Sequence, residues 1–335
     1  MADADADLTV GILGAGYFGE QHARAIAAVP GLRLTAVSDC DRALAQPLAD
    51  RHGATAGSDW RQLVADAAID IVVIATPHEL HMPMAIAAAQ AGKHTLLEKP
   101  MGRTVAECTA ILEAAEHSRT TLLIGQLLHF ALPSLVARRI LDAGDLGRPI
   151  AGTSALVKLW MEPNRRPWHL DPGRGGGMLM TAGIHALDLL VWFMGAPVAT
   201  VFAAAGTLMH AQAADDCAML LVRFADGRFG QVSSIGYRDG GIVYGMDLVC
   251  EKATLRIDFA RGVSIGRGGD WTPVANSAEP DWMLRALGRE WQAMQAAVRT
   301  GAPAPVSGAY GRHMVACIEA ALQSSRERRE VGVAP

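Results

Sequence analysis

The sequence predicts two domains of different class: an α/β domain with a doubly wound parallel sheet, then an α+β domain with a large, mainly antiparallel sheet. In the first third of the 335 residues, apolar strand-like runs alternate with helical patterns, as they do when helices connect parallel strands. From about residue 126, strand-like segments follow one another with short turns, which is typical of antiparallel sheets. Half of the residues are hydrophobic, enough for two substantial cores. We therefore expect the first domain over residues 1–125 and the second over residues 126–335.

The first expected strand, residues 8–13, runs into a glycine-rich turn, and a helical pattern follows to about residue 29. In a G-x-G-x-x-G turn of this kind, the first glycine makes the tight turn and the second admits a pyrophosphate. The third lets the helix pack near the strand, while the helix N-terminus attracts the anion. The alternative is a glycine turn that merely opens an α/β protein. The context favours a dinucleotide-binding (Rossmann) domain whose first cofactor residues are Gly14, Gly16, Tyr17, Phe18 and Gly19.

The second expected strand, residues 32–37, leads to a carboxylate that bears on cofactor choice. Asp39 lies somewhat over 20 residues past the first glycine, where a residue that binds the ribose hydroxyls of NAD belongs. Asp41 adds a second carboxylate, whereas the guanidinium of Arg42 could bind a 2′-phosphate or stack on adenine. Because a 2′-phosphate would bring like charges together at Asp39, we predict that NAD is preferred over NADP.

The rest of the first domain continues the alternation, and its strands end at the edge where a doubly wound sheet binds ligands. Lys99 follows the last residue of one such strand, so its ammonium should lie near the nicotinamide ring, whose positive charge would assist proton exchange. The alternative is a surface lysine in a loop. The expected strands are 69–75, 94–98 and 121–124, with a short segment at 54–56, and the expected helices are 42–51, 60–67, 82–91 and 105–117.

In the second domain, one helix carries polar residues on an otherwise apolar pattern. If it spans residues 178–194, then Thr181, His185 and Asp188 fall on one stripe, directly after the glycine-rich segment 171–177. Histidine has the unperturbed pKa that suits proton transfer near neutrality, although a buried structural histidine is an equal alternative. The other expected helices are 133–143, 280–299 and 308–326, and the expected strands are 150–160, 198–208, 218–224, 229–234, 245–249 and 254–259, with a hairpin turn at Asp226-Gly227.

The segment that precedes the glycine-rich loop holds aromatic and basic side chains. Trp168 could form the floor of a substrate pocket, and Arg165 or Arg166 could bind a substrate carboxylate with two hydrogen bonds. The alternative is a solvated loop with a packed indole.

Three segments taken together resemble the glucose–fructose oxidoreductase / inositol dehydrogenase / MocA (Gfo/Idh/MocA) family of nicotinamide-dependent oxidoreductases, and the resemblance covers nearly the whole chain. The second and third of these segments are specific only in combination. The segments are the turn 14–19 with His22, the residues Ala75-Thr76-Pro77, His81 and Ala91-Gly92-Lys93-His94 to Glu98-Lys99-Pro100, and the helix signature from Gly175 to Asp188.

The resemblance implies that Lys99 and His185 face the reacting carbon of a substrate, and that the second segment also contacts the cofactor. The third residue that the family usually has at this site is an aspartate four residues before the histidine. This chain has Thr181 at that position. A hydroxyl holds no charge and cannot raise the pKa of an imidazole as a carboxylate does. His129 is a second departure, since relatives often carry arginine there. The implied cofactor contacts, besides the glycine turn, Asp39 and Arg42, are Ala75, Thr76, Pro77, His81, Glu98 and Lys99.

We expect an NAD(P)-dependent dehydrogenase or reductase that transfers a hydride between nicotinamide and a secondary alcohol/ketone of a sugar, polyol, sugar acid or related small molecule. In this hypothesis His185 is the general acid/base, Lys99 polarises the substrate oxygen, and Thr181 orients the substrate or His185. Two alternatives remain open: an NAD-dependent glycosidase that oxidises its substrate transiently, and a nicotinamide-sensing regulatory protein without turnover. The expected catalytic residues are Lys99, His185 and Thr181, and Arg165 and Trp168 join them in binding substrate.

Composition excludes several other classes of protein. The net charge of −4 gives no basic field for nucleic acid or anionic lipid, and no apolar stretch approaches membrane-spanning length. The five cysteines are dispersed without metal-ligand spacing, so we expect reduced thiols, no metal and a cytoplasmic protein. The acidic start, residues 1–7, is expected to be a frayed leader and not a signal peptide. A large sheet with few helices to cover it, together with the family resemblance, predicts a homodimer or homotetramer packed through the C-terminal sheet.

Overall fold

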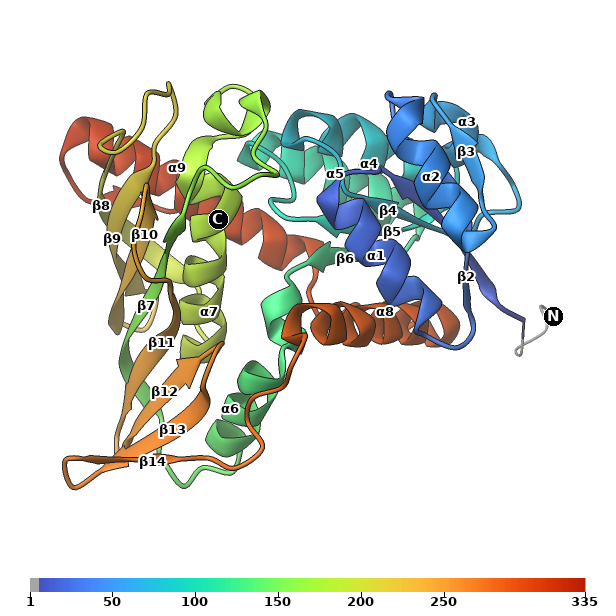
Figure 1. Cartoon of the computed structure of the whole chain (residues 1–335). Coiled ribbons are helices and arrows are strands. Elements are labelled where there is room, and N and C mark those ends of the chain that lie inside the picture. The colour runs from blue at the N-terminus through green and yellow to red at the C-terminus, as the bar shows by residue number, and fades with distance from the viewer. Residues whose placement is uncertain (1–5, 335) are drawn as a thin grey trace. The chain divides into compact units, whose positions relative to one another are not determined.

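The computed structural model describes residues 6–334, which divide into two compact units (Figure 1). The first consists of Met1–Gly102, Ala106–Leu127 and Met283–Arg312, and the second of Arg103–Val105, Leu128–Trp282 and His313–Pro335. The division after Leu127 lies two residues from the expected boundary. Segment 283–312 was expected in the second domain, but it belongs to the first unit. Residues 1–5 of the expected acidic leader lie outside the described residues.

The first unit is built on a six-stranded sheet in the order β3-β2-β1-β4-β5-β6, and every adjacent pair is parallel. This is the strand order of the doubly wound dinucleotide-binding fold, which the sequence predicted. All four residues of β4 are buried, as an almost wholly apolar strand requires. The strands are β1 (Leu8–Leu13), β2 (Leu32–Ser38), β3 (Thr55–Gly57), β4 (Ile71–Ile74), β5 (His94–Glu98) and β6 (Leu122–Gly125), and the helices are α1 (Tyr17–Ala27), α2 (Arg42–His52), α3 (Trp60–Ala65), α4 (His81–Gln90) and α5 (Val105–Ser118).

Helix α8 (Trp282–Thr300) completes the first unit from the far end of the sequence. Its residues Leu287, Trp291 and Met294 are spaced by four and three positions and are fully buried. The amide of Gln295 donates to the carbonyl oxygen of Pro30 at 2.9 Å, just before β2. Figure 1 shows α8 alongside α1, so a late segment of the chain supplies part of the core of the N-terminal fold.

The second unit is built on a nine-stranded sheet in the order β14-β13-β12-β11-β7-β10-β9-β8-β15. Only β7 and β10 pair in parallel, so the sheet is mainly antiparallel, as expected. The predicted hairpin turn joins β9 to β10 with Gly227 at φ +86°. The strands are β7 (Pro149–Leu159), β8 (Val198–Gly206), β9 (Cys217–Phe224), β10 (Phe229–Tyr237), β11 (Val243–Cys250), β12 (Thr254–Asp258), β13 (Gly262–Arg267), β14 (Asp270–Pro273) and β15 (Val331–Gly332), and the helices are α6 (Leu132–Asp142), α7 (Ile184–Met194) and α9 (Gly308–Glu327), whose first five residues belong to the first unit.

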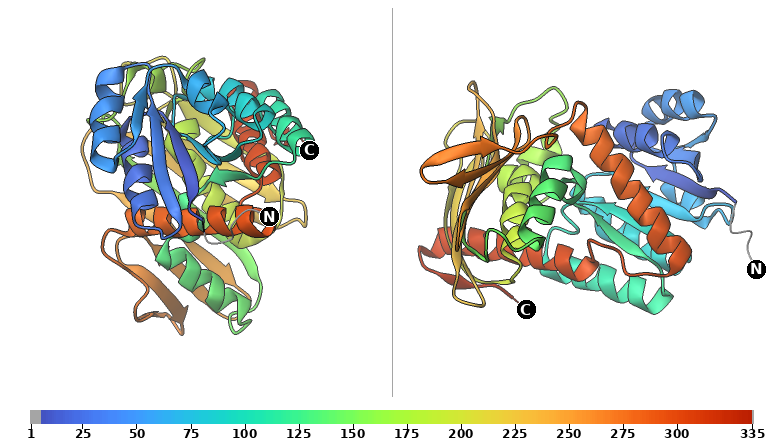
Figure 2. Two further views of the ribbon diagram at one scale, coloured as in Figure 1. Left: turned by 90° about the vertical axis from the view of Figure 1, so that its right-hand side faces the viewer. Right: turned by 90° about the horizontal axis from the view of Figure 1, so that it is seen from below.

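The two faces of this sheet differ in what covers them. Helix α7 packs on β7, β10 and β11, where inward-facing residues such as Leu156 and Val232 are buried (Figures 1 and 2). On the opposite face, four large apolar side chains of β8, β9 and β10 alternate with the buried ones and are exposed. The exposed fractions are 46% for Phe202, 52% for Met219, 50% for Leu221 and 54% for Phe229.

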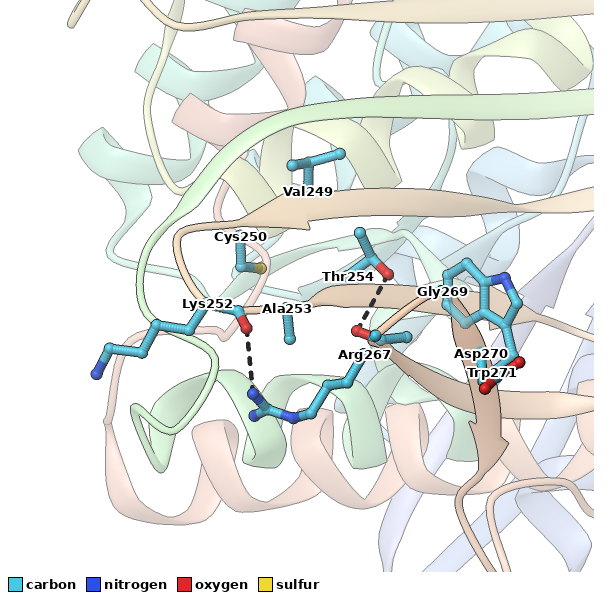
Figure 3. Close-up of a pocket in the computed structure, with 11 residues that line it drawn as sticks. Val249, Cys250, Lys252, Ala253, Thr254, Arg267, Gly269, Asp270 and Trp271 are labelled. Carbon is cyan, nitrogen blue, oxygen red and sulfur yellow. Dashed lines mark hydrogen bonds between the residues drawn. The ribbon is translucent and has the colours of Figure 1, made fainter.

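A hollow of about 490 Å³ lies at one end of the same sheet, between the β11–β12 turn and the β13–β14 hairpin (Figure 3). Arg267 crosses it and donates to the carbonyl oxygen of Lys252 at 3.1 Å, while Trp271 forms another part of its lining. None of the residues predicted for the functional site lines this hollow. The strands of this hairpin were not predicted.

Candidate active site

The glycine turn between β1 and α1 has the geometry that its sequence pattern demands. Gly14 adopts φ +100°, and a Cβ at this position would lie 2.5 Å from the carbonyl oxygen of Ala75. A Cβ on Gly19 would collide with the carbonyl oxygen of Gly14. Both positions therefore require glycine for steric reasons within the protein itself.

Gly16 differs from these two glycines, because a Cβ at this position would meet no protein atom within 4 Å. Gly16 is the N-cap of α1, and no side chain caps that helix end. The first amides of α1 and the space beside Gly16 are what the pyrophosphate of a dinucleotide requires. The turn therefore fits the predicted cofactor.

Asp39 stands one residue after β2, as predicted. One of its oxygens accepts from the amide of Ala15 at 2.8 Å, which ties it to the glycine turn, and the other accepts from the amide of Asp41 at 2.9 Å. Asp41 itself caps α2 by accepting from the amide of Ala43, and Arg42 is exposed and contacts Gln46. Of the two carboxylates, Asp39 is the one held beside the turn.

His81 holds the loop after β4 in place through contacts with main-chain oxygens. Its ring is fully buried, with Nε2 3.0 Å from the carbonyl oxygen of Thr76 and Nδ1 2.8 Å from that of Pro100. Burial lowers the pKa of this imidazole. His81 was predicted to contact the cofactor, but both ring nitrogens face main-chain oxygens of the protein. Its role is to hold the Ala75-Thr76-Pro77 loop against the segment that follows β5.

Lys99 directly follows β5 and is buried, with a cis peptide bond to Pro100. Its ammonium nitrogen lies 5.9 Å from the centre of the Phe18 ring, which belongs to the glycine turn. Lys99 and the residues of the turn are therefore brought to one edge of the sheet, as the sequence predicted. Glu98 was predicted as a cofactor contact, but its carboxylate is buried and bonded to His22 and to the amide of Lys99.

In the second unit, the residues before α7 form a π-helical segment, Leu179–Gly183, instead of the regular helix that was predicted. Single π-helical turns within helices frequently occur at functional sites. Thr181 lies in this turn and donates its hydroxyl to the carbonyl oxygen of Gly175 at 3.3 Å. His185, in the first turn of α7, is buried, as is Thr181. The π turn joins the glycine-rich loop to the histidine.

Asp215 anchors the start of this segment and was not foreseen. Its carboxylate accepts from the amide of Leu179 at 2.8 Å, and its main-chain oxygen accepts from the amide of Met178 at 2.9 Å. Burial raises the pKa of this carboxyl to about 6, although the hydrogen bond from the amide of Leu179 acts in the opposite direction. No local pattern connects Asp215 with a helix that begins 36 residues earlier.

Further along α7, Asp188 is fully buried and accepts from Nε2 of His129 at 2.8 Å. The His129 ring stacks on Trp192 with ring centres 4.0 Å apart. His129, which stands where relatives often carry arginine, is therefore hydrogen-bonded to Asp188, the last residue of the family's helix signature. Asp188 lies about one helical turn beyond His185 on the same helix.

Two predicted substrate residues occupy the segment after β7. Arg165 does not present a free guanidinium, because it stacks on Trp160 at 3.8 Å, bonds to the oxygen of that residue and pairs with Glu162. Burial lowers its pKa to about 10, so the guanidinium stays charged at neutral pH, and its predicted bond to a substrate carboxylate would have to compete with Glu162. Trp168 is half-buried and lies against Gly175 of the loop, and its place in the floor of a substrate pocket stays a prediction.

Within residues 6–334, histidine, cysteine and carboxylate side chains form no group that could hold a metal ion. Among the described helices, none has the length and apolar character needed to cross a bilayer. The doubly wound sheet, the glycine turn and Asp39 define a dinucleotide-binding protein with a second, sheet-based domain.

Comparison with known proteins gives the family. Residues 8–126 match the oxidoreductase family with an NAD-binding Rossmann fold, and residues 135–256 match the GFO/IDH/MocA C-terminal domain. The chain belongs to the Gfo/Idh/MocA family of oxidoreductases, which confirms the predicted family, fold class and NAD-type cofactor.

Three relatives are similar over most of their length. Levoglucosan dehydrogenase of Pseudarthrobacter phenanthrenivorans is 27% identical, covering 84% of this chain and 85% of the relative. Inositol 2-dehydrogenase of Rhizobium meliloti is 26% identical, covering 97% and 98%. The crystal structure of GenD2 from gentamicin A biosynthesis, in complex with NAD, superposes with a TM-score of 0.88 at 25% identity, covering 100% of this chain and 98% of GenD2.

Proposed function

We propose that this protein is an NAD-dependent dehydrogenase that interconverts a secondary alcohol and a ketone on a sugar, polyol, sugar acid or related small molecule. The observation that carries the proposal is the buried ammonium of Lys99, which stands at the edge of a dinucleotide-binding sheet beside the glycine turn. The names of the relatives, dehydrogenases of levoglucosan and of inositol, support hydroxyl-bearing cyclic substrates.

The roles of the residues follow from their chemistry. Bound NAD supplies the acceptor or donor of hydride. Lys99 donates a hydrogen bond to the substrate oxygen and stabilises negative charge on it. His185 takes the hydroxyl proton in oxidation and returns it in reduction. Thr181, whose hydroxyl is bonded to Gly175, holds the glycine-rich loop and the first turn of the His185 helix together.

The direct test is NAD⁺ reduction at 340 nm with a panel of polyols, sugars and sugar acids that includes inositol and levoglucosan. We expect absorbance to rise with at least one member. Cleavage of a glycoside with no net absorbance change would indicate the transient-oxidation glycosidase instead. Thr181 at the family's aspartate position favours a third candidate, a nicotinamide-sensing regulator, which would bind NAD and convert no member of the panel.

Cofactor choice gives a further prediction. We expect the protein to bind NAD⁺ more tightly than NADP⁺, and Asp39→Ala to shift the ratio toward NADP⁺. Charges about 4 Å apart repel by about 4 kcal/mol at an effective dielectric of 20, and screening reduces this at a half-exposed site, so the shift should be largest at low salt. Calorimetric titration of both cofactors measures the ratio.

The control is Asp41→Ala, which removes a neighbouring carboxylate that caps α2. It should weaken both cofactors equally, if at all. Tighter binding of NADP⁺ by the unmodified protein would remove the assigned role of Asp39.

We also propose that two or four copies assemble through the uncovered face of the C-terminal sheet, defined by Phe202, Met219, Leu221 and Phe229. Contiguous apolar surface of this kind marks an interaction site. Light scattering after gel filtration should report a dimer or tetramer, and Leu221→Arg should yield monomers. Leu44→Arg, at a residue that is 48% exposed on α2, is the matched control. A monomeric unmodified protein would end this proposal.

None of the five cysteines forms a disulfide bond, which supports a reducing compartment, and we assign the protein to the cytoplasm on that basis. Cys108, Cys250 and Cys317 are buried.

A further inference from the structure

A buried chain of hydrogen bonds in the first unit joins three elements that are far apart in sequence. The indole Nε1 of Trp291 on α8 donates to Nδ1 of His22 on α1 at 3.0 Å. Nε2 of His22 lies 3.0 Å from Oε1 of Glu98, the last residue of β5. The other carboxylate oxygen, Oε2, accepts from the main-chain amide of Lys99 at 3.2 Å.

All three side chains are withdrawn from solvent: Trp291 and His22 are 0% exposed and Glu98 is 5% exposed. Water therefore cannot replace a lost partner, and each bond must be supplied by the protein. Buried networks of this kind fix a single arrangement when every member is satisfied.

The chemistry of the indole determines the direction of the chain. An indole N–H can only donate, so Nδ1 of His22 must be an acceptor and carry no proton. The proton of the neutral ring is then on Nε2, which donates to Glu98. Both oxygens of Glu98 then act as acceptors, one from His22 and the other from the amide of Lys99. Trp291 thereby selects the tautomer of His22 that binds Glu98.

We propose that Trp291 and His22 are positioning residues for Lys99: through Glu98 they fix the main chain at Lys99 and place a carboxylate beside it. This inference rests on the proposed function, in which Lys99 contacts the substrate oxygen. It assigns a part in that chemistry to a tryptophan 192 positions later in the sequence than the lysine. Neither Trp291 nor His22 touches a reacting atom in this account.

The first test is Trp291→Phe in the full-length protein, which removes the indole N–H and keeps an aromatic ring. We expect kcat for inositol or levoglucosan, whichever is turned over, to fall by about 10- to 100-fold, while the Kd for NAD⁺ stays within about twofold. In a Lys99→Met background the same substitution should cause no further fall, because it acts through Lys99. Equal falls in both backgrounds would contradict the inference.

His22 allows a rescue experiment. His22→Leu removes both ring nitrogens, whereas His22→Gln retains one acceptor and one donor group on a single side chain. We expect the glutamine variant to recover most of the kcat that the leucine variant loses. Equal kcat in the two variants, with equal melting temperatures, would mean that packing and not hydrogen bonding is what His22 provides.

A second measurement needs no substrate. Lysine labelling with acetic anhydride, read by mass spectrometry, reports how well each ammonium is held. In Trp291→Phe we expect the labelling of Lys99 to rise by about fivefold, the factor that corresponds to the loss of one hydrogen bond. Lys93 is the internal control, since it is buried in the same unit and bonded to the oxygens of Asp66 and Ile69.

The two measurements separate the possible failures. Unchanged labelling of Lys99 overturns the positioning role, as does a parallel rise for Lys93, which would indicate general loosening. If labelling changes as expected but Lys99→Met retains full activity, the positioning chain stands and the catalytic role of Lys99 in the proposed function falls.

Discussion

Lys99→Met is expected to lower kcat by about 10²- to 10³-fold, the range for loss of one positioned donor that stabilises negative charge on the reacting oxygen. Methionine has a similar length and no charge, so the substitution removes the ammonium with little change in volume. NAD⁺ binding should change little, because the glycine turn and Asp39 carry it. Steady-state kinetics and cofactor titration on the same preparation measure both quantities. His185→Ala should lower kcat by a similar factor.

The matched control is Lys252→Met, which makes the same substitution at an exposed lysine of the β11–β12 turn. We expect its kcat to equal that of the unmodified protein. Full kcat in both Lys99→Met and His185→Ala would show that the dehydrogenase roles are wrongly assigned.

The second large effect concerns stability. Glu290 precedes Trp291 on α8 and is 0% exposed, and neither of its oxygens has a hydrogen-bond partner among residues 6–334. Burial raises the pKa of this carboxyl well above its usual value of 4.5, and the nearby charge of Glu98 raises it further. The folded protein therefore keeps a proton on Glu290 at pH values where the unfolded chain has lost it.

The sign of the pH effect follows from this difference. As pH rises above about 4.5, the unfolded state releases the proton and the folded state does not, so the free energy of unfolding falls by up to about 1.4 kcal/mol per pH unit. Glu290→Gln cannot titrate. We expect this variant to gain stability relative to the unmodified protein as pH rises above 5, until the pH reaches the raised pKa of the folded state. Urea unfolding at several pH values measures the difference.

Glu113→Gln is the control, since Glu113 is exposed on α5 of the same unit. Its stability should follow that of the unmodified protein at every pH. A constant difference between Glu290→Gln and the unmodified protein over this range would mean that Glu290 is already ionised at pH 5.

Sequence reasoning succeeded where the constraint is local. Gly14 and Gly19 could be predicted because the steric demands of a strand–turn–helix junction involve residues close in sequence or at a fixed place in the fold. The antiparallel character of the second sheet followed from short turns such as Asp226-Gly227. The placement of Lys99 after β5 followed from the rule that ligands bind at the carboxyl ends of parallel strands.

Sequence reasoning failed where the contacting residue lies far away in the sequence or was hidden by packing. The amphipathic pattern of α8 predicts that one face is buried but not against which domain, so its assignment to the second domain was natural and differs from the structure. Arg165 looked available because the sequence does not reveal that Trp160 and Glu162 enclose its guanidinium. The role of Asp215 and the π-helical turn depend on a contact between Leu179 and the loop that precedes β9, which no local pattern encodes.

The late position of α8 has a consequence for synthesis on the ribosome. The first unit is continuous to Leu127, but the helix that brings Leu287, Trp291 and Met294 into its core emerges only after about 155 further residues. At about 5–20 residues per second, this delay is about 8–30 seconds. During that interval the nascent N-terminal fold exposes an apolar groove and leaves His22 without its indole partner. The chain therefore cannot finish its nucleotide-binding fold before most of the second unit has been made, and the nascent protein is exposed to aggregation and to chaperone binding until α8 arrives.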